Sequence, residues 1–125
     1  MTVRLSRLKT RADFLRVAAE RARAVRPGLI LQAAPQPANM VETPRVGFTA
    51  SKRVGSAVVR NRAKRRLRAA AASVLPLHGR PGTDYVLIAR AGTGERVYAE
   101  LLADLEGALR QLARPHRKPA RGGDR

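Results

Sequence analysis

Apolar residues recur at helical spacing in three segments of the chain. The first segment follows Thr10, which has the spacing of a capping box with Asp13, and the second follows Ser56, a residue type that caps helix N-termini. The apolar positions are, in chain order, Phe14, Val17 and Ala18; then Ala63, Leu67, Ala70, Ala71 and Val74; then Leu101, Leu102, Leu105, Ala108, Leu109 and Leu112. Because residues three or four apart share one face of a helix, we predict helices over residues 10–20, 56–74 and 101–112.

Three other segments have the patterns of β-strands. Residues 25–34 contain a short apolar run, residues 45–50 alternate between apolar and polar positions, and residues 85–89 are continuously apolar, as in a fully buried strand. Prolines at positions 35, 37 and 44 mark a turn-rich loop between the first two segments. Strands that alternate with helices predict the α/β fold class.

A chain of 125 residues fits one compact domain. We assign residues 1–113 to this single domain, because the predicted helices and strands all fall within them. Residues 114–125 consist of proline, glycine and charged residues without an apolar pattern, and we predict that they form a disordered basic tail.

The chain is strongly basic, with 26 lysines and arginines against 9 acidic residues and a formal net charge of +17. Such self-repulsion costs stability unless a polyanion neutralises it, which predicts a nucleic-acid partner. An anionic membrane is the competing partner, but the sequence has no apolar anchor for one, so we expect no membrane association. The chain has no cysteine, which excludes disulfides and favours the cytoplasm as its compartment.

The basic residues concentrate between Lys52 and Arg68, where the chain holds eight of them and no acid. On a helix, Arg60, Lys64 and Arg68 lie four residues apart, so like charges stack and destabilise the helix. A merely solvated helix face is the alternative interpretation, but such faces normally interleave glutamate with lysine. We therefore interpret this segment as a surface that binds phosphate groups, with the Asn61 amide available to ribose hydroxyls or base edges.

Three consecutive stretches extend this basic segment into a longer motif: Arg45-Val46-Gly47, Ser51-Lys52-Arg53-Val54-Gly55 and Ala57-Val58-Val59-Arg60-Asn61-Arg62-Ala63-Lys64-Arg65. Together they resemble the RNR signature of the bacterial ribonuclease P protein family, and the similarity covers nearly the whole chain except the tail. The resemblance implies a small two-layer α/β sandwich of αβββαβα type, with a left-handed crossover around the basic helix. It also implies that the following residues contact the catalytic RNA: Arg45, Lys52, Arg53, Arg60, Asn61, Arg62, Lys64, Arg65, Arg66 and Arg68.

The same resemblance implies a second binding region. In that family a cleft between the sheet and the first helix, lined by aromatic residues, binds the single-stranded 5′ leader of precursor tRNA. Phe14 matches one position of the cleft, and we assign Phe48 to leader binding with it. Ordinary packing in the core is the alternative interpretation for both side chains.

The sequence predicts neither a protein-borne catalytic site nor a metal site. Its two histidines lie in a Pro/Gly turn, at His78, and in the tail, at His116, and its acidic residues are scattered singly. The resemblance implies that Mg²⁺ ions held by the RNA subunit and the substrate activate water, while the protein positions the precursor. The expected partners are ribonuclease P RNA and precursor tRNA, with no further protein required.

Two other functions fit a small basic chain. A structural protein of the ribosome would bind ribosomal RNA with the same kinds of contacts. A DNA-compacting protein is a weaker alternative, because the arginine-rich helix has no dimerisation heptads and major-groove readers usually act as dimers or arrays.

Overall fold

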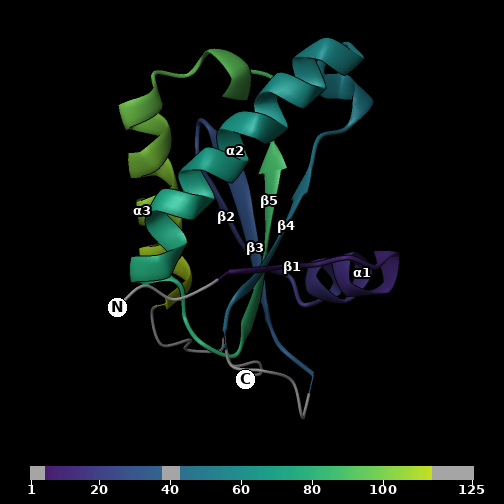
Figure 1. The fold of residues 1–125 in the computed structure, drawn as a ribbon, viewed down its shortest axis with the longest axis vertical. Helices are drawn as coiled ribbons and strands as arrows, with labels where there is room; N and C mark the ends of the chain where they lie inside the picture. The colour runs from purple at the N-terminus through teal and green to yellow at the C-terminus, as the bar shows by residue number, and fades with distance from the viewer. Residues whose placement is uncertain (1–4, 38–42, 114–125) are drawn as a thin grey trace, which may run out of the picture.

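The computed structural model describes residues 5–37 and 43–113 of the chain (Figure 1). The strands and helices follow one another as β1 (Ser6–Arg7), α1 (Arg11–Ala19), β2 (Ala22–Val25), β3 (Leu29–Pro35), β4 (Arg45–Thr49), α2 (Ala57–His78), β5 (Thr83–Ala89) and α3 (Tyr98–Ala113). Short 3₁₀ turns at Lys52–Val54 and Thr93–Glu95 precede α2 and α3. The predicted α/β class is confirmed, and so is the αβββαβα order, to which the structure adds β1.

The strands form one five-stranded sheet in the order β1-β4-β5-β3-β2. β4 and β5 are parallel neighbours, and α2 is the helix that connects them. β3 is antiparallel to both β5 and β2. The resemblance implied a left-handed crossover at α2, and that handedness stays a prediction.

The sheet carries an apolar cluster on each face, because side chains alternate along every strand. Leu31 of β3 and Leu87 of β5 point to the face covered by α2 and α3, where they join the main core. Val86 of β5 points to the other face, where it packs in a smaller cluster with Val17 of α1. Figure 1 shows α1 lying apart from α2 and α3, so the basic helix and the first helix cover different faces of the sheet.

Several elements differ from the predictions, among them α3, which begins at Tyr98 rather than at residue 101. Residues 25–34 form parts of two strands, since β2 ends at Val25 and a tight turn through Pro27 and Gly28 leads into β3. α2 continues past the predicted end to His78 with Pro76 inside it, because packing of its buried residues outweighs the loss of one backbone donor. β1 was not predicted, because two residues are too few to show a period.

The predicted tail, residues 114–125, lies outside the described residues. Its disorder therefore stays a prediction.

Candidate nucleic-acid interface

The helix α2 begins in a way that leaves its first turn positively charged. The Ser56 hydroxyl accepts a hydrogen bond from the backbone N–H of Val59 at 3.3 Å. The preceding residue, Gly55, has a φ of 149°, which residues other than glycine rarely adopt. No acidic residue lies in the first turn. Arginines near a helix N-terminus are unfavourable beside the positive end of the helix dipole, whereas phosphate groups are attracted to it. The local structure therefore suits an anionic ligand better than it suits the isolated helix.

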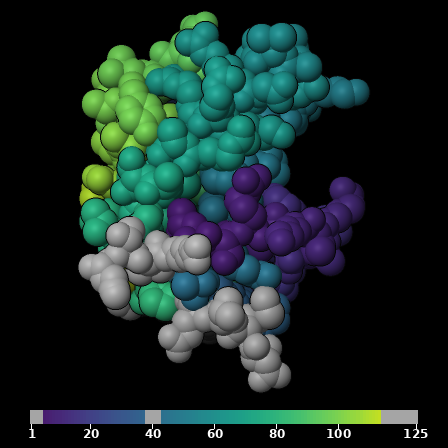
Figure 2. All heavy atoms as spheres, viewed as in Figure 1, coloured from purple at the N-terminus to yellow at the C-terminus, as the bar shows by residue number. Residues whose placement is uncertain are grey.

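The basic residues of α2 lie on the side opposite its buried stripe. Ala63, Leu67 and Ala70 are fully buried against the sheet and α3. Asn61 and the arginines at positions 65 and 68 lie three or four residues apart on the outward ridge, and all three are exposed. Figure 2 shows α2, in teal, crossing the surface of this face of the molecule. These three side chains thus form one exposed row along the helix.

The structure divides the predicted RNA-binding residues into two groups. Six of them are exposed, and their side chains make no hydrogen bond or ion pair with any other described residue: Lys52, Arg53, Asn61, Arg62, Arg65 and Arg68. Lys64 is half-buried. Arg60 donates to the carbonyl oxygen of Gly55 at 2.9 Å, and Arg66 donates to the carbonyl oxygens of Thr93 and Arg96 at 2.9 and 2.6 Å. The first group is available to phosphates, whereas Arg60 and Arg66 also hold the local structure.

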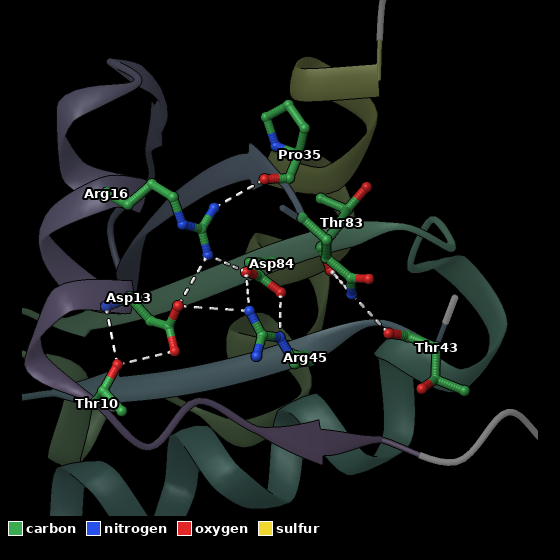
Figure 3. A network of polar contacts seen from close by, with 9 residues as sticks. Thr10, Asp13, Arg16, Pro35, Thr43, Arg45, Thr83 and Asp84 are labelled. Carbon is green, nitrogen blue, oxygen red and sulfur yellow. Dashed lines mark hydrogen bonds and ion pairs between the residues drawn. The ribbon is translucent and has the colours of Figure 1, made fainter. Parts of the chain in front are cut away.

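Arg45 is the third predicted residue with a protein partner (Figure 3). Its Nε and Nη2 donate to the two carboxylate oxygens of Asp84 at 2.8 and 2.7 Å. Asp84 is fully buried at the start of β5, and Arg16 of α1 donates to the same carboxylate. The hydrogen bonds to Asp84 raise the pKa of the Arg45 guanidinium although burial alone would lower it. Arg45 therefore joins the parallel strands β4 and β5 through a bidentate pair.

The same network fixes α1 on its face of the sheet. Thr10 caps α1 by accepting from the backbone N–H of Asp13 at 3.2 Å, and its hydroxyl donates to the Asp13 carboxylate at 3.0 Å. Arg16 donates to that carboxylate and to the carbonyl oxygen of Pro35 in β3. Burial opposes ionisation of Asp13, but the hydrogen bonds from Thr10 and Arg16 and the charge of Arg45 together lower its pKa. Arg16 and Asp84 were not predicted as a pair, because their separation in sequence hides the contact.

The two predicted leader-binding residues lie on different faces of the sheet. Phe14 packs on Gly47 of β4 so closely that a Cβ at Gly47 would lie 2.5 Å from the ring, and it borders the smaller cluster beneath α1. Phe48 borders the main core instead, and the guanidinium of Arg7 lies 5.5 Å from its ring centroid. The structure therefore does not bring Phe14 and Phe48 together.

A groove beside β1 and the start of α1 is lined by several basic side chains. The groove is lined by Ser6, Arg7, Lys9, Thr10, Asp13 and Arg45. Arg7 and Lys9 are exposed there, whereas the charge of Arg45 is already paired with Asp84. An extended anionic strand that reached Phe14 would find cations from β1 and the loop after it.

Neither a metal cluster nor a membrane segment is found within residues 5–37 and 43–113. These residues contain no group of three or more histidine, aspartate or glutamate side chains placed to hold an ion. No helix among them is long and apolar enough to cross a membrane.

Comparisons with known proteins agree with this arrangement. A family model described as Ribonuclease P matches residues 3–113. The ribonuclease P protein component of Paramagnetospirillum magneticum is 56% identical over 114 residues, which cover 90% of this chain and 86% of that protein. The corresponding component of Caulobacter vibrioides is 53% identical over 112 residues, covering 90% of this chain and 74% of that protein.

Solved structures give the same result at lower identity. The ribonuclease P protein of Thermotoga maritima superposes with a TM-score of 0.69 at 25% identity, covering 89% of this chain and 98% of that one. The Staphylococcus aureus protein superposes with a TM-score of 0.70 at 25% identity, covering 86% and 94%. The chain belongs to the ribonuclease P protein family.

Proposed function

We propose that the exposed face of α2 binds the catalytic RNA of ribonuclease P and that the resulting complex removes the 5′ leader of precursor tRNA by endonucleolytic cleavage. The observation that carries this proposal is the row of exposed, unpartnered cations on α2 in a chain of this family. Guanidinium groups bind phosphate bidentately, and each contact releases counterions from the RNA. The net charge of +17 adds long-range attraction for the same partner.

Catalysis in this proposal belongs to the RNA. Mg²⁺ ions bound by the RNA subunit and the substrate would supply the activated water, and the protein would neutralise charge and position the precursor. The exposed arginines and the Asn61 amide of α2 support this division of labour, because such groups bind phosphates and base edges. We expect the assembly in the cytoplasm, with no further protein partner.

Leader binding would use the α1 side of the sheet. Phe14 lies there, and the groove with Arg7 and Lys9 lies beside the edge strand β1, where the Arg7 guanidinium reaches the Phe48 ring. If the leader binds one face of the sheet and the catalytic RNA binds the other, this small protein can contact both RNAs at the same time. Phe48 would contribute to leader binding only through its backbone in β4, because its ring borders the main core on the other face of the sheet.

Cleavage of a 5′-extended precursor tRNA at low Mg²⁺ tests the proposal. The reaction is run with a bacterial ribonuclease P RNA alone, with this protein alone, and with both. We expect cleavage in the mixture far above that of the RNA alone, and none from the protein alone.

Two other outcomes would contradict the proposal. Activity of the protein alone would mean that the protein carries its own active site. No enhancement in any mixture would favour the structural role in the ribosome, which is otherwise disfavoured because the relatives are ribonuclease P protein components.

A further inference from the structure

Tyr98 has the most exposed ring among the phenylalanines and tyrosines of this protein. The chain has two phenylalanines, two tyrosines and no tryptophan, and all four rings fall within the described residues. Tyr85 is 2% exposed, and Phe14 and Phe48 border the two apolar clusters. Tyr98, the first residue of α3, is 38% exposed. Part of this ring is therefore open to solvent, where it can contact a ligand.

The Tyr98 ring lies beside the basic face of α2. The guanidinium carbon of Arg66 lies 5.9 Å from the ring centroid, within the range of a cation–π contact. Arg62, one turn earlier on α2, runs along the same loop, since a Cβ at Gly94 would lie 3.9 Å from its Cδ. Because the Arg62 side chain is exposed and makes no polar contact with another described residue, it can bind a phosphate beside the loop that leads into Tyr98.

The loop that leads into Tyr98 is held in place by buried and partly buried hydrogen bonds. The hydroxyl of Thr93, which is fully buried, donates to the carbonyl oxygen of Gly28 and accepts from the backbone N–H of Arg90, both at 2.7 Å. Arg96 donates from Nε to the carboxylate of Asp104 at 2.9 Å. Arg66 adds its two hydrogen bonds to the carbonyl oxygens of this loop. The ring is therefore positioned before any ligand arrives, which lowers the entropic cost of binding to it.

We propose that Tyr98 stacks on an unpaired base of the RNA that the α2 face binds. This inference rests on the proposed function and adds a second mode of contact to it. Phosphate contacts along α2 would position the RNA without reading its bases, whereas an exposed ring offers a π-face to a base that has left a helix. The neighbouring Val97 is 61% exposed and extends the apolar surface around the ring.

Fluorescence of a Tyr98→Trp variant tests the inference directly, because the chain contains no other tryptophan. The variant is titrated with a bacterial ribonuclease P RNA, and binding is followed in the same sample by anisotropy of a dye on the RNA. We expect indole emission to be quenched as the RNA binds, and acrylamide to quench the remaining emission less than it does in free protein. Leu15→Trp is the matched control, since Leu15 is 55% exposed on α1, which covers the other face of the sheet.

Affinity provides an independent measurement. Tyr98→Leu removes the ring but keeps an apolar side chain, and we expect it to weaken RNA binding by about 5- to 160-fold, the range of one base–aromatic stack. Tyr98→Phe keeps the ring and should bind nearly as tightly as the unmodified protein. Binding of the Leu variant with unchanged affinity would overturn the inference.

The failure of this inference can be distinguished from failure of the proposed function. If the RNA binds Tyr98→Trp while its emission changes no more than that of Leu15→Trp, the stacking site is wrong and the proposed function stands. If the unmodified protein fails to bind the RNA at all, both the proposed function and the stacking site are wrong.

Discussion

Replacing two exposed arginines of α2 should weaken RNA binding and stabilise the free protein at the same time. Arg62 and Arg65 make no polar contact with other described residues, so alanine at both positions removes two phosphate ligands and breaks no internal bond. Each lost phosphate contact lowers the salt slope of the binding constant by about 0.7 to 0.9, so the double variant should lose about 1.4 to 1.8 units. Between about 0.05 and 0.2 M salt, its affinity deficit should therefore shrink about 7- to 12-fold.

The stability change has the opposite sign for a separate physical reason. Arg62 lies three or four residues from Arg65 and Arg66, and Arg65 lies three residues from Arg68. Each of these like-charged pairs destabilises a helix by about 0.2–0.5 kcal/mol, and alanine also has the highest helix propensity. Urea denaturation of the free variant should give a midpoint above that of the unmodified protein with an unchanged slope.

The assay is the equilibrium binding constant for ribonuclease P RNA, measured at several salt concentrations. A control variant must remove the same charge elsewhere, and Arg21→Asn with Arg23→Ala does so on the edge strand β2 and the turn before it. Both residues are exposed, and asparagine suits the φ of 67° at Arg21. Arg23 points away from the α2 face, because its neighbour Ala24 is buried in the main core.

The reasoning would be refuted if both double variants lost the same salt slope. That result would mean that the RNA responds to net charge alone and that the α2 face has no special role. A fall in the urea midpoint of the α2 variant would separately show that these arginines support the fold.

Three further predictions concern the other face of the sheet. Asp84→Ala leaves the half-buried Arg45 without its partner and should lower the free energy of unfolding by about 3 kcal/mol in urea denaturation. This value is near the lower limit for breaking a buried pair, because Arg16 is 31% exposed. A loss as small as that of Glu100→Ala, which breaks a surface pair, would contradict the structural role of Asp84. The pKa of Asp13 is lowered below its ordinary value of 3.8, so its contribution to stability is complete above that pH and is lost as the pH falls through the lowered pKa. The difference in urea midpoint between the unmodified protein and Asp13→Asn should therefore shrink below about pH 4. A constant difference down to about pH 2 would be inconsistent with ionisation of Asp13 as the cause. Phe14→Leu keeps most of the packing on Gly47 but removes the aromatic ring on which a leader base could stack. It should therefore weaken binding of precursor tRNA to the assembled complex more than binding of mature tRNA. Equal weakening of both would exclude Phe14 from the leader site.

Most of the fold could be predicted because the apolar periods are strong where the packing is extensive. The buried stripe of α2 and the continuous apolar run of β5 are both recovered as predicted. The hairpin of β2 and β3 could not be separated from a single strand, since Val25 and the run from Leu29 are interrupted only by a three-residue turn. The two-residue strand β1 depends on pairing with β4 and has no local signal of its own.

The sequence by itself determined that this protein binds a polyanion and where its cations concentrate, because charge and helical period are local properties of the chain. Only the tertiary structure decided what each cation does. It pairs Arg45 with the buried Asp84 across two parallel strands, ties Arg66 to the loop before α3, and leaves Arg62 and the outward ridge of α2 exposed. It also assigned Phe14 and Phe48 to opposite faces and brought Tyr98 next to Arg66. These outcomes follow from strand order and helix placement, which depend on contacts between residues far apart in the chain.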